Sequence, residues 1–304
     1  MAALRSAGPL RLGGSMALSV AGAESNVAIG LARLGHRVQW IGRVGGDELG
    51  ALILRTLRAE NVDVSGIRVD QRRPTGLVLF EQRLSDLTRV LYYRTGSAGS
   101  GLEATDLSAA LAAQPRVLHL TGITPALGDG AARAALGAAE QARQAGITIC
   151  LDVNYRARLW SPADARAALA PLAAAANLIF ASESELALLT TGPASDTAEA
   201  ARQLLDKGAE TVVVKLGAQG ATAYNGDGIT SVRARRAHVV DVVGAGDAFV
   251  AGYLSAALDG LDTAGRLDRA AAVSAFAIAS SGDWEGLPTR NELDLLDAAG
   301  EAIR

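Results

Sequence analysis

The amino-acid sequence predicts an α/β protein whose central sheet is mainly parallel and covered by helices on both faces. Between Arg116 and Lys215, short apolar segments typical of buried strands alternate with longer, alanine-rich segments typical of helices. This alternation indicates β–α–β units, in which successive strands run in the same direction. The chain has 304 residues, of which 49% are hydrophobic, and no repeat or linker divides it. We therefore expect a single domain over residues 1–304.

The elements of this region follow from where the apolar runs begin and end. We expect strands at 116–120, 147–151, 177–180 and 211–215, and helices at 129–145, 162–175, 182–190 and 196–208. In open α/β sheets, ligands bind at the carboxyl ends of the strands. All four strands end in polar or glycine-rich sequence, which indicates one shared site: Thr121–Pro125, Asp152–Arg156, Ser182–Glu185 and Lys215–Gly220.

The N-terminal region adds a strand and a glycine-rich helix start. Residues 10–22 alternate weakly, like a strand with one covered side, and an apolar helix then runs from Gly22-Ala-Glu-Ser-Asn26 to Gly35. The small residues beside Asn26 indicate backbone close to a ligand; the alternative is a turn capped by Ser25 or Asn26. A strand over 36–44 and a helix to about residue 61 are expected next.

A second β-layer is expected outside the main sheet. Short strand-like runs occur between Ile67 and Arg94, and the segments Gly76–Phe80 and Thr88–Tyr93 suit a hairpin. Together with residues 10–21 they would form a small separate sheet. The alternative is an edge hairpin of one larger sheet. The position of both pieces beside the expected ligand-binding segments favours the separate layer.

Composition excludes several classes of protein. The net charge of −3, with 20% charged residues, does not indicate a nucleic-acid partner. The one cysteine, Cys150, lies in an apolar run and is expected to be a buried strand thiol. No apolar run reaches the ~18 residues of a membrane helix, and the first residues lack the apolar core of a signal peptide. We expect a cytoplasmic enzyme with no membrane partner.

The segment Asp241–Gly252 carries the strongest chemical signal. Gly244, Ala245 and Gly246 have almost no side chains and precede an alanine-rich helix, so their amides can approach an anion at the positive end of the helix dipole. Asp247 stands inside this anion site, where a carboxylate suits a general base that accepts a proton from an attacking hydroxyl. The alternative is an acidic residue in the first turn of an ordinary helix.

This segment resembles the C-terminal signature of the ribokinase-like (PfkB-type) sugar kinases, nearly position for position. Gly22-Ala-Glu-Ser-Asn26 and Gly42-Arg-Val-Gly-Gly-Asp-Glu-Leu-Gly50 also resemble that family, and with the strand-end segments the resemblance covers nearly the whole chain. It implies a three-layer αβα fold with a β-sheet lid, here about 10–21 and 67–95, that often forms a dimer surface. It also implies a carbohydrate kinase in which Asp247 is the catalytic base and the amides of Gly244, Ala245 and Gly246 hold the transferred phosphoryl group.

The same resemblance implies ATP and Mg²⁺, and in some members K⁺. The string of a P-loop does not occur. Lys215, Gly217 and Gly220 resemble the family's nucleotide loop, for which a solvated turn is the alternative, and Asn154 resembles a nucleotide contact. Glu185 is the candidate for Mg²⁺, through water, although the family's Asn-x-x-Glu reads Ser182-Glu-Ser-Glu185 here. Asp241 would orient the loop or bind a monovalent cation.

The substrate is indicated by two arginines. Tyr92-Tyr93-Arg94 and Asn154-Tyr155-Arg156 place Arg94 and Arg156 beside polar aromatics, and arginine binds carboxylates bidentately. Two surface arginines are the alternative. Both strings resemble the 2-keto-3-deoxygluconate kinase branch, in which these arginines and tyrosines meet a sugar acid; Gly22 and Asn26 belong to the sugar-binding segment, and Asp283 matches a further substrate contact. A neutral-sugar kinase of the fructokinase or ribokinase type and a non-catalytic sugar or nucleotide sensor stay as alternatives.

Two departures from the family pattern carry expectations of their own. Members normally open with a hydrophobic strand before the first lid piece, whereas this chain begins at Met1-Ala-Ala-Leu. Either the start codon is misassigned or the central sheet lacks its first strand, and a sheet without an interior strand is expected to be poorly stable. Ala271 replaces an asparagine near the adenine. The lid is expected to form a homo-oligomer.

Overall fold

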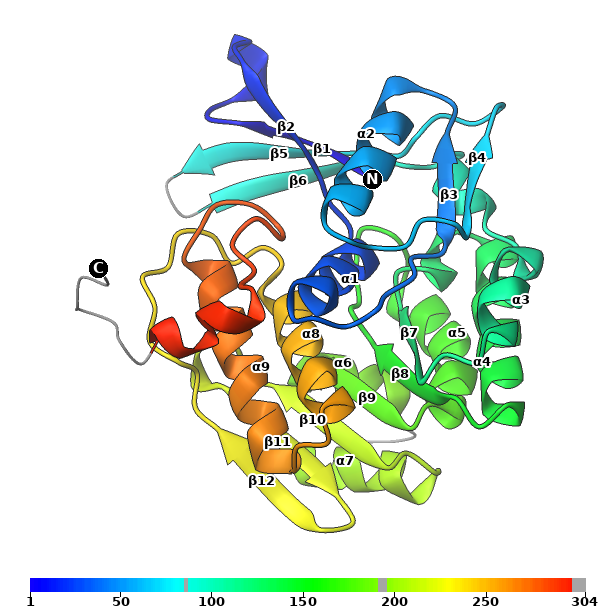
Figure 1. The fold of residues 1–304 in the computed structure, drawn as a ribbon, viewed down its shortest axis with the longest axis vertical. Coiled ribbons are helices and arrows are strands. Elements are labelled where there is room, and N and C mark those ends of the chain that lie inside the picture. Colours follow the sequence, from blue (N-terminus) through cyan, green and yellow to red (C-terminus); the bar gives the residue numbers. More distant parts are fainter. Residues whose placement is uncertain (85–86, 191–195, 297–304) are drawn as a thin grey trace.

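A six-stranded sheet forms the centre of the computed structural model, which describes residues 1–84, 87–190 and 196–296. The strand order is β12-β11-β10-β9-β8-β7. The four strands β7 to β10 are parallel, and β11 and β12 add an antiparallel edge (Figure 1). The bounds are β7 (Val117–Thr121), β8 (Thr148–Asp152), β9 (Leu178–Ser182), β10 (Thr211–Lys215), β11 (Ala221–Asn225) and β12 (Gly228–Val232).

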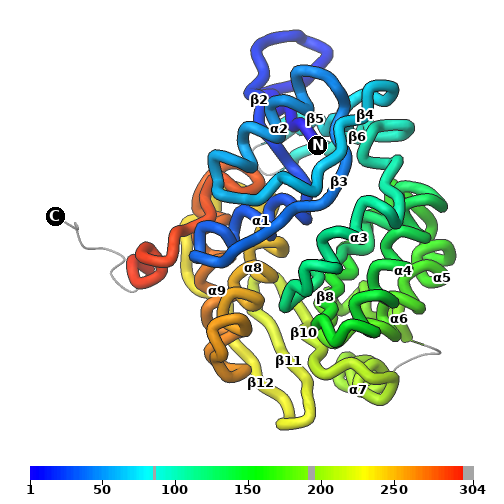
Figure 2. Tube along the Cα trace, turned by 45° about the vertical axis from the view of Figure 1, so that its right-hand side comes forward, coloured from blue at the N-terminus to red at the C-terminus, as the bar shows by residue number. Residues whose placement is uncertain are grey.

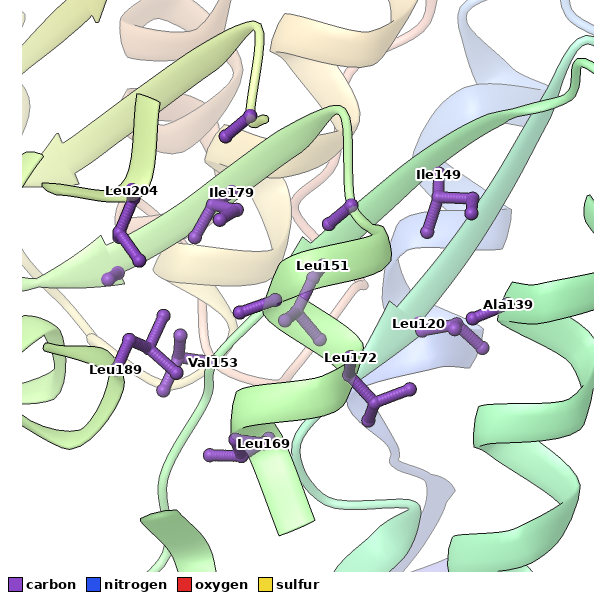
Figure 3. Close-up of a cluster of buried hydrophobic side chains, with 14 of the residues drawn as sticks. Leu120, Ala139, Ile149, Leu151, Val153, Leu169, Leu172, Ile179, Leu189 and Leu204 are labelled. Carbon is purple, nitrogen blue, oxygen red and sulfur yellow. The ribbon is translucent and has the colours of Figure 1, made fainter. Parts of the chain in front are cut away.

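Helices cover both faces of this sheet because both faces are apolar. In β8, Ile149 and Leu151 pack among helix residues on one face, whereas Cys150 between them packs with Phe249 on the other. Figure 3 shows the first of these clusters, with Ile149 and Leu151 among the leucines of the neighbouring helices. The first face carries α3 (Ala104–Ala112), α4 (Asp129–Gln144), α5 (Pro162–Ala175), α6 (Glu183–Leu189) and α7 (Thr197–Asp206); the second carries α1 (Ala23–Arg33), α8 (Ala245–Leu258) and α9 (Thr263–Ile278).

The expected three-layer αβα fold is therefore confirmed. Every strand and helix expected between residues 116 and 215 is present, and no bound moves by more than two residues. Among the helices that the structure describes, none combines the length and the apolar character needed to cross a bilayer.

A four-stranded lid sheet of order β2-β1-β5-β6 lies at one end of the molecule (Figure 1). It differs from the expected segments in two ways. Residues 2–6, which were not expected to be a strand, pair with β2 and run parallel to β5. Residues 67–70 were expected in the lid but pair with a different strand, and residues 85–86 of the expected lid lie outside the described residues. The lid strands are β1 (Ala2–Ser6), β2 (Met16–Val20), β5 (Leu77–Leu84) and β6 (Leu87–Tyr93).

A third, two-stranded sheet stands apart from the other two. It pairs β3 (Gly42–Gly45) with β4 (Ile67–Asp70), and the helix α2 (Glu48–Ala59) connects them. Within the described ranges, β3 pairs only with β4 and β7 only with β8. The tube in Figure 2 shows β3 and β4 beside the lid, away from β10 to β12. This separation agrees with the expected lack of one central strand.

Candidate active site

A cavity of about 640 Å³ lies where the lid, the carboxyl ends of the parallel strands and the start of α8 meet. The strand-end rule therefore located it correctly. Residues expected in the site come from sequence segments more than 250 positions apart and are brought together here. They are Gly22, Asn26, Tyr92, Arg94, Asn154, Arg156, Glu185, Lys215, Gly217, Gly244, Gly246, Asp247 and Asp283.

Four expected site residues do not line this cavity. Tyr93 follows Tyr92 on a strand whose side chains alternate, so it points to the opposite face of the lid and is 60% exposed. Gly220 instead supports a turn, because a Cβ at this residue would lie 2.0 Å from the carbonyl oxygen of Val232. The amide of Ala245 donates to the carbonyl of Val242 at 3.3 Å. Asp241 is bound to an arginine that is described below.

The start of α8 supplies free amides at the cavity wall. Gly244 precedes the helix with a φ of +77°, and a Cβ there would lie 2.0 Å from the carbonyl oxygen of Asp283, so only glycine fits. The amides of Gly246 and Asp247 have no hydrogen-bond partner among the described residues. These two donors at the positive end of a helix can hold an anionic oxygen.

Asp247 is buried at the bottom of this arrangement and is only 6% exposed. Its Oδ2 accepts a hydrogen bond from Nδ2 of Asn26 at 2.7 Å, and its Oδ1 accepts one from Nδ2 of Asn154 at 3.2 Å. Burial, and then the negative charge of Asp152, raise the pKa of Asp247 to about 7. A carboxyl group with a pKa near neutrality is well suited to accept and release a proton.

Asn154 connects Asp247 to a buried ion pair. Its Nδ2 also lies 3.2 Å from Oδ2 of Asp152, whose Oδ1 accepts from Nζ of Lys215 at 2.7 Å. The backbone of Asn154 has a φ of +40°, a left-handed conformation that asparagine tolerates better than most residues. The sequence suggested a nucleotide contact for Asn154, and the structure directs its amide group at the carboxylate of Asp247.

Glu185 lines the cavity with both carboxylate oxygens engaged by backbone amides. It accepts from the amides of Ser182 and Tyr155, each at 2.7 Å. Ser182 in turn caps α6, so the serine that replaces the family's asparagine completes a capping box. Across the described residues, no three His, Cys, Asp or Glu side chains are placed to hold a metal together. Each Glu185 oxygen keeps a second lone pair, which fits a water-bridged Mg²⁺ that is held mainly by phosphate.

Two arginines face the cavity without a carboxylate partner. Arg94 follows β6 and is half-buried; its side chain makes no hydrogen bond or ion pair with the described residues, and its Nε is buried without a partner. Burial lowers the pKa of Arg94, and the charges of Glu24 and then Tyr92 act in the opposite direction. Arg156 is exposed, and its side chain likewise has no hydrogen-bond or ion-pair partner among the described residues. Its charge lowers the pKa of Asp247.

Arg5 is a site residue that the sequence analysis missed. From β1 of the lid, its Nη1 lies 3.2 Å from Oδ2 of Asp241, and its Nη2 contacts Oδ1 of Asp283. The guanidinium carbon lies 4.0 Å from the centre of the Phe80 ring. Burial raises the pKa of Asp283 to about 6, and Arg5 acts in the opposite direction. A strand prediction over residues 2–6 would have placed Arg5 on the inner face of the lid, beside Ala3.

Glu24 is the second residue that was missed, although it lies inside the quoted Gly22–Asn26 segment. Its Oε1 accepts from the hydroxyls of Thr121 at 2.6 Å and Thr124 at 3.0 Å, which ties α1 to the end of β7. The carboxylate lines the cavity and stabilises the cationic form of Arg94.

Comparison with known proteins identifies the family. The pattern of the pfkB family carbohydrate kinases matches residues 2–290. The 2-dehydro-3-deoxygluconokinase of Bacillus subtilis (strain 168) is 40% identical over 90% of this chain and 85% of its own length. The enzyme of that name from Thermoproteus tenax is 37% identical over 95% of this chain and 88% of its own.

A solved structure agrees with this assignment. It is the putative ribokinase II of E. coli in complex with ATP and Mg²⁺, which superposes with a TM-score of 0.89 at 25% identity over 97% of this chain and 96% of its own. The match to the family spans nearly all of the described residues, including the start of α8 and the lid. The chain belongs to the PfkB family of carbohydrate kinases.

Proposed function

We propose that this chain transfers the γ-phosphoryl group of ATP to the terminal hydroxyl of 2-keto-3-deoxygluconate, an open-chain or cyclic sugar acid with one carboxylate. The observation that carries the choice of a sugar acid is the unpaired state of Arg94 and Arg156 in the cavity that holds Asp247. The names of the two similar kinases support the same substrate.

A sugar acid would supply the anionic partner that the side chains of Arg94 and Arg156 lack. A guanidinium that loses water without gaining an anion is destabilised, and the lowered pKa of Arg94 reflects this loss. A substrate carboxylate would restore the missing partner through charge-assisted hydrogen bonds, which contribute about 1.5–3 kcal/mol each. A neutral sugar offers hydroxyl groups only and would give neither guanidinium an anionic hydrogen-bond partner.

The proton transfer is assigned to Asp247. Asn26 and Asn154 hold its two oxygens, so the lone pair that accepts the substrate proton has a defined direction. With a pKa of about 7, the carboxyl group is substantially ionised at neutral pH and can take the proton as the hydroxyl attacks phosphorus. The free amides of Gly246 and Asp247 stabilise the negative charge on the transferred phosphoryl oxygens.

The nucleotide side of the cavity is assigned to Lys215 and Gly217, with Glu185 as the residue that would hold Mg²⁺ through water. Bound Mg²⁺ supplies charge neutralisation on the phosphates. Burial alone would lower the pKa of Lys215, but the acids Asp152, Glu185 and Asp247 together outweigh it and raise the pKa, so Lys215 keeps its positive charge. An ATP complex of a similar fold supports ATP as the donor.

The test is an ADP-release assay over sugar acids and neutral sugars. We expect turnover with 2-keto-3-deoxygluconate. We also expect the Arg94→Met and Arg156→Met variants each to raise its KM by about 10- to 100-fold with a smaller effect on kcat, since each removes a ground-state contact to the carboxylate. Arg133→Met is the matched control, because Arg133 is exposed on α4 and does not line the cavity.

Other outcomes would identify the alternatives. Turnover of fructose or ribose that survives both arginine substitutions would indicate a neutral-sugar kinase. Binding of sugar and nucleotide without any ADP release, in wild type and Asp247→Asn alike, would indicate a sensor. Unchanged turnover in Asp247→Asn would refute the assignment of the base.

A further inference from the structure

The family resemblance implies a monovalent cation at Asp241, and the residues around Asp241 do not fit one. A cation site needs oxygen lone pairs that point at a common position. Here Oδ1 of Asp241 accepts from the amide of Val243 at 3.0 Å, and Oδ2 accepts from the amide of Gly282 at 3.4 Å and from Nη1 of Arg5 at 3.2 Å. Both oxygens therefore face N–H hydrogens, which repel a cation.

Arg5 already supplies the positive charge at this place. Its guanidinium bridges Asp241 and Asp283, and its other side rests on the ring of Phe80. The side chain is mostly buried, and the two carboxylates lie on segments that flank the start of α8: Asp241 precedes Gly244 on the chain, while the carbonyl of Asp283 lies against Gly244. The Arg5 guanidinium, which lies between the two carboxylates, thus holds together the two segments on either side of Gly244, where the free amides begin.

We propose that Arg5 is a built-in counter-cation that takes the place of a dissociable monovalent cation at Asp241, so that the kinase works without K⁺ or Na⁺. The cation is covalently part of the lid strand β1. It neutralises two acids, of which Asp283 lines the cavity, whose negative charges would otherwise repel an anionic substrate, and it positions the turn before α8. Arg5 acts through Asp241 and Asp283 and touches no reacting atom, so it is a positioning residue.

The proposal rests on the kinase activity for its kinetic readout, and a second readout avoids that dependence. Two quantities are measured in potassium, sodium and choline chloride at equal ionic strength. They are the melting temperature of the ligand-free protein and the kcat/KM of the reaction. For the wild type we expect the same melting temperature and kcat/KM within about twofold in all three salts, since no site binds the ion.

Removal of the Arg5 guanidinium should make the protein dependent on a monovalent cation. Arg5→Met keeps an apolar side chain against Phe80 but leaves Asp241 and Asp283 without a counter-charge. We expect this variant to lose about tenfold or more in kcat/KM in choline chloride, and KCl to restore both activity and melting temperature in a saturable manner. Arg11→Met, an exposed arginine of the same lid segment, should behave like the wild type in every salt.

Three results would overturn the proposal. The first is a saturable rise of the wild-type melting temperature or kcat/KM with K⁺ over choline. The second is an Arg5→Met protein that folds, loses activity and gains nothing from KCl, which would make Arg5 an ordinary ion-pair residue. The third is a fully active Arg5→Met protein in choline chloride. The melting-temperature comparison of the wild type tests the proposal even if the variant does not fold, or if the substrate is a different sugar.

Discussion

At the residue scale, Asp247 combines two properties that oppose each other. The carboxyl group is buried beside the negative charge of Asp152, which raises its pKa to about 7. Such a group is a good base but is costly to ionise inside a folded protein. The amides of Asn26 and Asn154 reduce that cost only in part. The burial that makes Asp247 a good base is therefore expected to lower the stability of the folded protein.

The Asp247→Asn variant should show both effects. We expect kcat to fall by about 10²- to 10⁴-fold, because the general base is lost. We also expect the variant to melt at a higher temperature than the wild type at pH 8. The folded-state pKa of Asp247 lies above its unfolded value, so the wild type loses stability as the pH rises from about 4 to 7. Asparagine does not titrate, and at pH 8 the difference in unfolding free energy can reach about 4 kcal/mol.

Melting curves at pH 5 and pH 8 provide the measurement. The gain of Asp247→Asn over wild type should be larger at pH 8, where the aspartate is ionised. Asp227→Asn, in an exposed turn, should show little change at either pH. An equal gain at both pH values would contradict the raised pKa.

Asn154 has two roles that substitutions can separate: its side chain orients the carboxylate of Asp247, and its backbone adopts a left-handed conformation. Its amide holds Oδ1 of Asp247, and its φ of +40° suits asparagine or glycine. We expect Asn154→Gly and Asn154→Ala to lower kcat to a similar extent, because both lose the amide. Alanine should be less stable than glycine at this position by about 1 kcal/mol. Chemical denaturation of both variants, together with their kcat values, checks this. An alanine variant that is the more stable of the two would refute the role of the backbone.

The site residues that could be predicted from the sequence are those in short motifs, such as Gly244, Asp247 and Asn26. Their motifs carry local information about a helix start, and all three line the cavity. Tyr93 was predicted wrongly to share the site with Tyr92, because only the register of β6 decides which of two adjacent tyrosines faces inward. Arg5 escaped prediction because its partners lie more than 230 residues away.

At the element scale, the parallel strands and their helices were predictable because each has a local signal of its own: a short apolar run for each strand and a longer, alanine-rich run for each helix. The lid was less predictable, since its strands are amphipathic and its central pairing joins β1 to β5, which lies far along the chain. The pairing of β4 with β3 and of β1 with β5 depends on tertiary contacts that no local pattern contains.

The separation of β3 from β7 leads to a prediction for the N-terminal end of β1. Met1 lines the cavity, and burial lowers the pKa of its amino group to about 5. Within the described ranges, one side of β3 and one side of β7 carry unpaired backbone groups. We expect a short hydrophobic segment fused before Met1 to pair with these edges and to raise the melting temperature by several degrees.

The matched control for this fusion is a segment of the same length that consists of glycine and serine, which has little tendency to form a strand. Thermal melting of the three proteins provides the comparison. Equal stability of the wild type and the hydrophobic fusion would contradict the prediction, as would an equal gain from the glycine–serine segment.

At the scale of the whole molecule, the outer face of the lid carries a row of leucines. Register places Leu18, Leu4, Leu79 and Leu91 side by side across β2, β1, β5 and β6, on the face opposite Arg5 and Phe80. Leu18 is 52% exposed. An apolar row of this kind on a sheet is typical of a surface that associates, and we propose that two copies of the chain meet there.

Leu18→Glu should therefore convert a homo-oligomer into monomers, because it places a charge at the most exposed end of a self-associating apolar row. Light scattering coupled to size exclusion measures the mass directly. Ile229→Glu, on β12 at the far end of the central sheet and similarly exposed, should leave the assembly intact. A monomeric wild-type protein, or a Leu18→Glu protein of unchanged mass, would count against association through the lid.

The single cysteine has a practical consequence for work on this enzyme. Cys150 is buried in β8, and burial raises the pKa of its thiol well above the usual value, so it is a poor nucleophile toward maleimides. The natural sequence thus already provides a silent background for site-specific labelling. A pair of cysteines introduced at the exposed residues Tyr93 of the lid and Asp227 of the β11–β12 turn would accept donor and acceptor dyes. Single-molecule energy transfer could then follow the lid as sugar and nucleotide bind, with no need to remove a native thiol first.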